Sequence, residues 1–258
     1  MMIKTLSLFL LSVGFVATAS AQTAPVSAPM DVYLLVGQSN MAGRGPLKRE
    51  DKQPVPGVMV LNKEDKWASQ GEPIHFDKGD AGVGLGFTFG KIRANSNPNI
   101  TVGLVPCAVG NTSMDQWQPG GALYDNAIRR ARLAQERGQL KAILWHQGEA
   151  ECGSQDKASA YAGRLAKLVA SFRKDLNQPD LPFVCGELGE FLYTRSKSPF
   201  AKLVNEQIRR VPQLVPRSAV ALSKDLKDKG DQLHFDSDSL KELGKRYHEA
   251  LLTIETRK

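Results

Sequence analysis

Residues 31–41 read DVYLLVGQSNM, an apolar run that passes directly into a turn containing Gly37. A strand that ends in a tight glycine turn brings the following side chains to the carboxyl edge of a sheet, where open α/β sheets carry out their chemistry. Here those side chains include Ser39, with a helix expected to begin behind it. The stretch therefore predicts a first strand over residues 31–36 and a candidate nucleophile at Ser39.

A carboxylate and an imidazole stand three positions apart near the other end of the chain, at Asp231 and His234. A serine hydroxyl is a weak nucleophile that needs a base, and the base needs a group that orients it. Taken alone, each residue also has a simpler interpretation. Asp231 follows Lys229 and Gly230 and is equally suited to capping a turn. His234 alone is better explained as a partly buried, hydrogen-bonded imidazole.

Apolar segments typical of strands alternate with amphipathic segments typical of helices along the chain. The expected strands cover residues 31–36, 58–62, 100–106, 142–145, 183–185 and 220–222, and the expected helices cover residues 82–94, 123–136, 161–175, 200–210 and 237–253. This alternation favours a parallel sheet of about five strands with right-handed crossovers, in a three-layer α/β/α sandwich. Residues 44–80 lack a helical pattern and are expected to form long loops with one strand, near the substrate cleft.

The amino terminus has the composition of a secretory signal. One positive charge, Lys4, precedes a short apolar core, and Ala19-Ser20-Ala21 suits cleavage. The apolar core is shorter than the roughly 20 residues that a membrane-spanning helix needs. We therefore expect a signal peptide over residues 1–21, a single α/β domain over residues 22–258, and a secreted or periplasmic protein.

The charge distribution and the cysteine spacing argue against a nucleic-acid-binding protein and against a zinc site. Although the net charge is +7, the basic residues are scattered and are not interleaved with aromatic residues, which favours solubility over nucleic-acid binding. Cys107, Cys152 and Cys185 have no zinc-like spacing. Export permits one disulfide, but the strand positions favour buried free thiols. We expect no metal, no nucleic acid, no membrane contact after cleavage, and a monomer by default.

Four segments that follow predicted strands are expected to meet at one edge of the sheet. They read GQSNMAGR at residues 37–44, PCAVGNT at 106–112, WHQGE at 145–149 and DQLHF at 231–235. Together and in this order they resemble the SGNH, or GDSL-like, hydrolase superfamily. More narrowly, they resemble its sialate O-acetylesterase-related group, which includes acetylxylan esterases of carbohydrate esterase family 6. The resemblance implies a flavodoxin-like α/β/α fold and a triad of Ser39, His234 and Asp231.

The resemblance also implies an oxyanion hole formed by the backbone N–H groups of Ser39 and Gly110. A third donor in the wider superfamily is an asparagine of a Gly-x-Asn-Asp motif, which this chain lacks. We expect the amide of Gln147 to replace it. Gln38 and Asn40 are alternatives for this role, and each is also suited to bracing the loop.

Further residues have two possible roles each. Glu149 is either a second acid that orients His234 or a structural carboxylate. Trp117 is either a stacking surface for a sugar at the rim of the cleft or part of the core, and Asn111 extends the Gly110 loop. We expect Gln38, Asn40, Asn111 and Trp117 to contact substrate.

Other α/β enzymes fit the sequence less well. The elbow of an α/β-hydrolase reads Gly-x-Ser-x-Gly, whereas the fifth position here is Met41, and no phosphate-binding glycine loop follows the first strand. The expected function is an exported serine esterase that acts through an acyl-enzyme and needs no cofactor. The resemblance implies O-acetylated carbohydrate as substrate, with acetylated xylan first and O-acetylated sialic acid second. A carbohydrate-binding relative without catalysis is the alternative.

Overall fold

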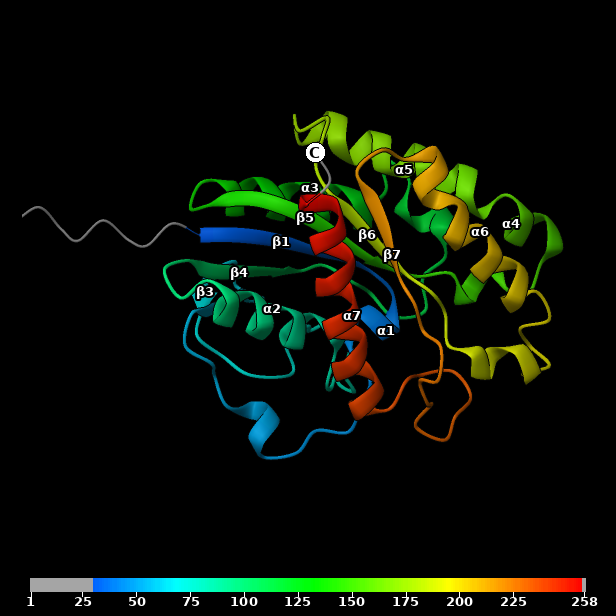
Figure 1. Cartoon of the computed structure of the whole chain (residues 1–258), viewed down its shortest axis with the longest axis horizontal. Helices are drawn as coiled ribbons and strands as arrows, with labels where there is room; N and C mark the ends of the chain where they lie inside the picture. The colour runs from blue at the N-terminus through cyan, green and yellow to red at the C-terminus, as the bar shows by residue number, and fades with distance from the viewer. Residues whose placement is uncertain (1–29, 257–258) are drawn as a thin grey trace, which may run out of the picture.

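The computed structural model describes residues 30–256, which form one seven-stranded sheet with helices on both faces (Figure 1). The strands are β1 (Met30–Gly37), β2 (Val58–Leu61), β3 (Trp67–Ala68), β4 (Thr101–Pro106), β5 (Gln139–His146), β6 (Phe183–Gly186) and β7 (Ser218–Ala221), in the spatial order β3-β2-β4-β1-β5-β6-β7. The predicted signal peptide at residues 1–21 lies outside the described residues.

All neighbouring strands are parallel except β3, which runs antiparallel to β2. The α/β/α sandwich is thereby confirmed. Each of the six expected strand ranges overlaps a strand of the sheet, so the expected number of about five was too low, and β3 is a seventh strand. The strand β3 is only two residues long, so it offers no alternation of apolar and polar residues from which it could be predicted.

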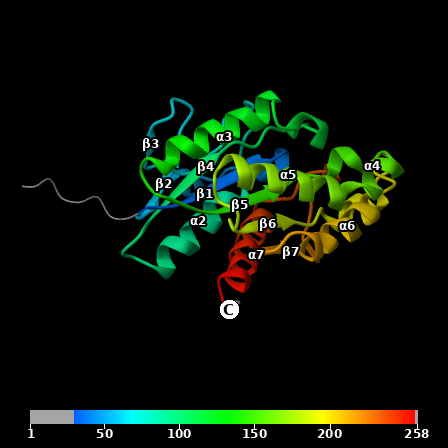
Figure 2. The ribbon, with the colours of Figure 1, turned by 90° about the horizontal axis from the view of Figure 1, so that it is seen from above.

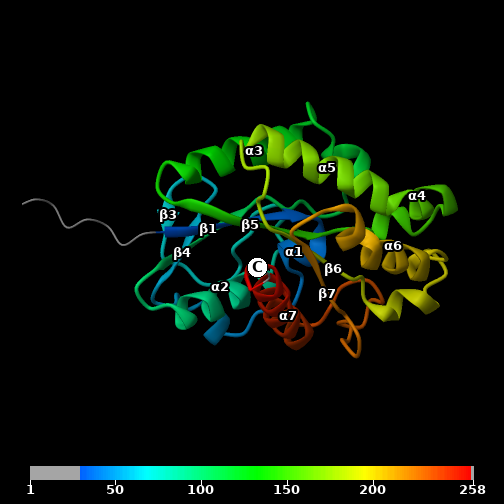
Figure 3. The same cartoon turned by 45° about the horizontal axis from the view of Figure 1, so that its top comes forward.

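The helices form two layers that enclose the sheet. The longer helices are α2 (Leu85–Ser96), α3 (Ala122–Gln135), α5 (Tyr161–Asp175), α6 (Ala201–Leu214) and α7 (Ser237–Glu255), the short ones are α1 (Ser39–Ala42) and α4 (Gln155–Ser159), and 3-10 turns cover Glu50–Lys52, Met114–Trp117, Glu149–Glu151 and Glu190–Thr194. Helices α3, α5 and α6 pack in one core cluster, and α2 and α7 pack in the other. Figures 2 and 3 show α3 and α5 on the opposite side of the sheet from α2 and α7.

Strand β1 is the centre of the sheet, between β4 and β5. Its alternate side chains enter different cores: Val32 and Leu34 pack toward α3 and α5, whereas Tyr33 and Leu35 pack toward α2 and α7. A strand covered on both faces has no solvent face, which explains why its sequence is continuously apolar.

The carboxyl ends of β1, β4 and β5 open at one edge of the sheet, because these strands are parallel neighbours. The turn after β1 is held against β5 by the backbone N–H of Gln38, which donates to the carbonyl of His146 at 2.8 Å. The loop that precedes α7 reaches the same edge, and the side chain of Asp236 caps α7 by accepting from the N–H of Ser239. Four segments far apart in the sequence thus meet there.

All three cysteines are free and buried, with Cys107 beside β4 and Cys185 within β6.

Among residues 30–256, no helix is long and apolar enough to cross a membrane.

We predict that Gly37→Ala destabilises the protein far more than Gly120→Ala. Both glycines have positive φ angles, +127° and +82°, so both substitutions strain the backbone. A Cβ at Gly37 would also lie 2.1 Å from the carbonyl oxygen of His146, whereas nothing lies within 4 Å at Gly120. In urea unfolding, the free energy of unfolding should fall by on the order of 4 kcal/mol for Gly37→Ala and by about 1 kcal/mol for Gly120→Ala. Equal losses would mean that the contact with β5 does not limit position 37.

Candidate active site

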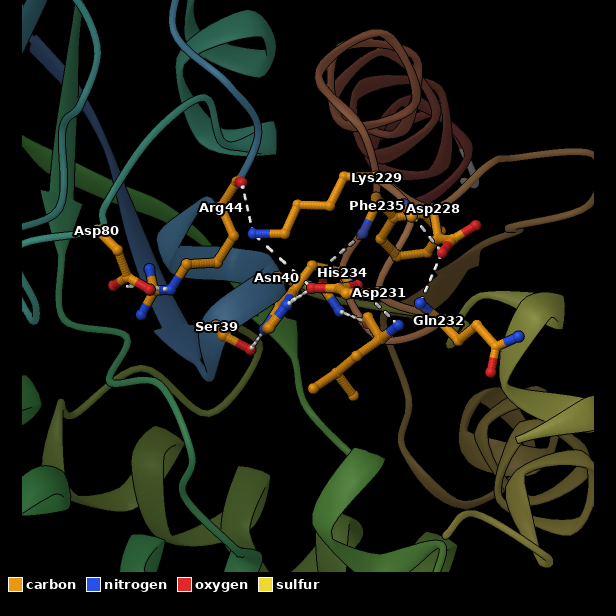
Figure 4. A network of polar contacts seen from close by, with 12 residues as sticks. Ser39, Asn40, Arg44, Asp80, Asp228, Lys229, Asp231, Gln232, His234 and Phe235 are labelled. Atoms are coloured by element: carbon orange, nitrogen blue, oxygen red, sulfur yellow. Dashed lines mark hydrogen bonds and ion pairs between the residues drawn. The ribbon is translucent and has the colours of Figure 1, made fainter. Parts of the chain in front are cut away.

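Ser39, His234 and Asp231 form a continuous hydrogen-bonded chain (Figure 4). The Oγ atom of Ser39 lies 3.0 Å from Nε2 of His234, and Nδ1 of His234 lies 2.6 Å from Oδ2 of Asp231. Ser39 is the first residue of α1, and the other two residues come from the loop between β7 and α7. The structure thus brings together three residues that are separated by nearly the whole described chain.

The hydrogen bonds determine which ring nitrogen of His234 carries the proton. An ionised carboxylate can only accept hydrogen bonds, so Nδ1 donates to Asp231 and Nε2 is left as the acceptor that faces the hydroxyl of Ser39. Burial opposes the ionisation of Asp231. The backbone N–H and the ring of His234 and the backbone N–H of Leu233 nevertheless hold the pKa of Asp231 below its usual value. This arrangement is the one that a general base needs.

Asp231 also shapes the loop that carries His234. Its Oδ1 accepts from the backbone N–H groups of Leu233 at 2.9 Å and His234 at 2.8 Å, while Oδ2 is left for the imidazole. One turn earlier, Oδ2 of Asp228 accepts from the N–H groups of Gly230 and Gln232. The two interpretations of Asp231 are therefore compatible, because one carboxylate oxygen caps the turn and the other contacts the ring.

Asn40 braces this loop against the end of β5. Its Nδ2 donates to Oε1 of Glu149 at 2.6 Å and to the carbonyl of Leu233 at 3.2 Å, and its Oδ1 accepts from the N–H of Phe235 at 3.1 Å. These two backbone groups flank His234 in the sequence. Asn40 is 1% exposed and its amide is fully used, which corrects the expectation that it contacts substrate.

Glu149 contacts Asn40 and not His234, since no direct hydrogen bond to His234 is present among residues 30–256. It lines the cleft but is 8% exposed. Burial raises the pKa of Glu149 from 4.5 to about 7, against the opposing effect of the hydrogen bond from Asn40. The geometry thus fits a carboxyl group that positions the histidine loop indirectly.

Two further expectations are corrected by the structure. Nε2 of Gln147 donates to Oε2 of Glu151 at 2.5 Å and to the carbonyl of Thr112 at 3.2 Å, and the side chain is fully buried, so its amide does not reach the cleft. Trp117 is likewise fully buried, and its ring packs edge-on against Trp145 at 5.5 Å. A buried tryptophan in the core cannot stack on a sugar at the rim.

The surroundings of Gly110 contain an ion pair that the sequence did not reveal. Nη2 of Arg44 lies 2.6 Å from Oδ2 of Asp77, and the two side chains are 3% and 1% exposed. The same Oδ2 accepts from the backbone N–H of Gly110 at 2.8 Å. Burial opposes the ionisation of Asp77, but the guanidinium and this N–H hold its pKa below the usual value. The N–H of Ser39, at the first position of α1, has no acceptor within its helix.

These residues line a cleft of about 280 Å³. Its walls consist of Gln38, Ser39, Arg44, Lys78, Asp80, Gly110, Asn111, Glu149, Ala150, Arg195, Leu233 and His234. Gln38 and Asn111 thus line the cleft, and their contact with substrate stays a prediction. Lys78, Asp80 and Arg195 were not expected, because they lie in stretches without a motif or a periodic pattern from which a role could be inferred.

We predict that Glu149 makes folding less favourable as the pH rises from about 4.5 to about 7. Over this window the folded protein keeps the proton that the unfolded chain has released, so the stabilising contribution is complete below 4.5 and lost above 7. In Glu149→Gln, the decrease in unfolding free energy over this range should be smaller by on the order of 3 kcal/mol.

Urea unfolding of wild type and variant at several pH values measures this difference. Glu206→Gln, which changes an exposed carboxyl group in α6, is the control and should follow the wild type. Parallel pH profiles for Glu149→Gln and the wild type would contradict the raised pKa.

Comparisons with known proteins show the family and the fold of the chain. The family model for carbohydrate esterase, sialic acid-specific acetylesterase, matches residues 29–253. A probable carbohydrate esterase of Arabidopsis thaliana is 32% identical over 176 residues, which are 60% of this chain and 68% of the plant protein.

Solved structures show the same fold. An X-ray structure of an Arabidopsis thaliana protein has a TM-score of 0.80 at 28% identity, over 87% of this chain and 98% of that one. NanS has a TM-score of 0.70 at 16% identity, over 90% and 99% of the two chains. A carbohydrate acetylesterase from Xanthomonas citri has a TM-score of 0.64 at 18% identity, over 87% and 56%. The last two similarities concern the fold alone. On the match to the family model, the chain belongs to the carbohydrate esterase family of sialic acid-specific acetylesterases, within the SGNH-related group.

Proposed function

We propose that this protein is an exported serine esterase that removes O-acetyl groups from carbohydrates. The observation that carries this proposal is the hydrogen-bonded chain from Ser39 Oγ through His234 to Asp231. Membership of a carbohydrate esterase family supplies the class of substrate. The proposed export depends on the signal-like composition of residues 1–21.

In the proposed mechanism, Oγ of Ser39 attacks the acetyl carbonyl while Nε2 of His234 takes its proton. The carbonyl electron pair moves onto oxygen, and Asp231 stabilises the imidazolium that forms. When the tetrahedral intermediate collapses, the bond to the sugar oxygen breaks and His234 gives the proton to the departing alcohol. Water then attacks the acetyl-serine by the same route, which releases acetate and restores Ser39.

The size of the cleft favours a small acyl group. Its volume of about 280 Å³ is at the lower end for small-molecule sites. Acetylated xylan stays the first candidate substrate and O-acetylated sialic acid the second. One observation favours the second: Lys78 and Arg195 line the cleft, and neither is in an ion pair with a described carboxylate. Two such cations suit an anionic sugar better than a neutral one.

We predict that wild-type protein releases acetate from acetylated xylan or from a small acetyl ester and that Ser39→Ala does not. The variant lacks the nucleophile, so its rate should fall by about 10⁴-fold or more. Ser96→Ala, at the exposed end of α2, is the matched control and should keep full activity. A folded wild type that releases no acetate from either compound would instead favour a carbohydrate-binding protein without catalysis.

We also predict that Lys78→Gln combined with Arg195→Gln raises KM for an O-acetylated sialic acid several-fold. The same variant should leave KM for a neutral acetyl ester unchanged, because only the anionic sugar gains from the two charges. Lys197→Gln, an exposed residue outside the cleft, is the control. An unchanged KM for the sialic acid ester would leave acetylated xylan as the preferred substrate.

A further inference from the structure

Arg44 is held in the wall of the cleft by four polar contacts. Its Nη1 donates to the carbonyl of Gly43 at 2.7 Å and to Oδ1 of Asp77 at 3.4 Å, and its Nη2 donates to Oδ2 of Asp77 at 2.6 Å. Its Nε lies 3.4 Å from Oδ1 of Asp80, as Figure 4 shows. The guanidinium is thus fixed in one orientation, and although it is almost fully buried it still lines the cleft that holds Ser39.

Gly110 is what allows this guanidinium to approach the nucleophile. A Cβ atom at position 110 would lie 2.5 Å from Nη2 of Arg44, 3.2 Å from Oδ2 of Asp77 and 3.4 Å from Cβ of Ser39. One point beside Gly110 is therefore in contact range of the ion pair and of Ser39. Any side chain there would push the cation away from the serine.

The proposed reaction needs hydrogen-bond donors to the oxyanion, and most of the donors expected from the sequence are already bound to other groups in this structure. Of the three expected donors, the amide of Gln147 is bound to Glu151 and Thr112, and the N–H of Gly110 is bound to Asp77. Only the N–H of Ser39 is left. Removal of a single oxyanion donor from a serine hydrolase slows catalysis by about 10²–10³-fold, so the charge that develops on the carbonyl oxygen needs a further partner.

Arg44 has an N–H of Nη2 to spare. A guanidinium carries five N–H groups; the hydrogen bonds above use both on Nη1 and one on Nη2, and Nε is in the ion pair with Asp80. The second N–H of Nη2 has no acceptor among residues 30–256. Nη2 is also the atom nearest to the point that Gly110 leaves open beside Ser39.

We propose that Arg44 is a catalytic residue, whose Nη2 donates a hydrogen bond to the oxyanion that forms when Ser39 attacks the ester carbonyl. This inference rests on the esterase function proposed above. Arg44 keeps all its protons throughout, since the proton of Ser39 goes to His234 and returns to the leaving alcohol. Asp77 is a positioning residue that fixes the guanidinium and balances its charge in the free protein.

The test compares Asp77→Asn with the double variant Arg44→Met, Asp77→Asn. The double variant avoids leaving Asp77 as an unpaired buried charge, which would by itself destabilise the protein. The substrate is p-nitrophenyl acetate, a neutral ester for which a cation gives no advantage in ground-state binding. We expect the double variant to lose about 100-fold in kcat with little change in KM, and Asp77→Asn to stay within about tenfold of the wild type.

A second readout separates catalysis from folding. Modification of Ser39 by an organophosphonate places a phosphonyl oxygen where the oxyanion would lie, so its rate should fall in parallel with kcat. The matched control is Arg130→Met, Asp65→Asn, which removes another pair with a buried arginine, outside the cleft. This control should keep its kcat even if its unfolding free energy falls by as much as that of the test variant.

Two results would overturn the role of Arg44. The first is a double variant with a kcat within threefold of Asp77→Asn. The second is an Asp77→Asn variant whose kcat falls as far as that of the double variant, because the Arg44–Asp77 ion pair would then be needed only for the structure of the loop. Failure of the esterase function itself looks different, since the wild type would then be inactive toward p-nitrophenyl acetate.

Discussion

The close packing of the end of β1 against the end of β5 is the constraint on which the candidate site depends. Gly37 has no Cβ, and therefore its backbone can approach the carbonyl of His146 and the N–H of Gln38 can donate to it at 2.8 Å. This contact sets the turn that begins α1 and the turn after β5 side by side. Ser39 and Glu149 are carried by these two turns, so their separation is determined by the sheet and not by flexible loops. Catalytic groups on such rigid supports keep their geometry more precisely than groups on free loops.

The histidine loop has no strand of its own to support it, and it is held by polar groups instead. Asp228 and Asp231 cap successive turns within the loop, while Asn40 ties the backbone on both sides of His234 to the first helix. Lys229 adds a link from the loop to the carbonyl of Arg44 at 3.3 Å. Burial of a carboxyl group such as Glu149 is costly, and the short hydrogen bond that Asn40 donates to it offsets only part of that cost. The cost of burying Glu149 thus falls next to the loop that holds the imidazole of His234, where a precise position is most useful.

Much of this arrangement can be predicted from the sequence, and the exceptions have a common cause. Helices α5 and α7 begin where expected because amphipathic periodicity and the cap at Asp236 are local signals. The contact between Ser39 and the Asp231–His234 loop can also be predicted, because both segments belong to the motifs that were expected to meet at one edge of the sheet. The burial of Trp117 and the bonding of Gln147 to Glu151 are properties of tertiary packing. No spacing in the chain shows whether an amide at the end of a strand turns toward the cleft or into the core.

The ion pair of Arg44 and Asp77 illustrates the same limit and also suggests why the pair is present. Two charges that are almost completely buried contribute little to stability, because the cost of removing them from water rivals their attraction. An apolar pair of similar size would fill this space at no such cost. Asp77 accepts at the same oxygen from Arg44 and from the N–H of Gly110, so a negative oxygen already sits where donors from two chain segments converge. Among the described residues, Arg44 keeps one N–H of Nη2 free on the side of Gly110 that faces Ser39, so the pair still offers a charged donor to a developing oxyanion. The retained charge is therefore better explained by the reaction in the cleft than by the stability of the fold.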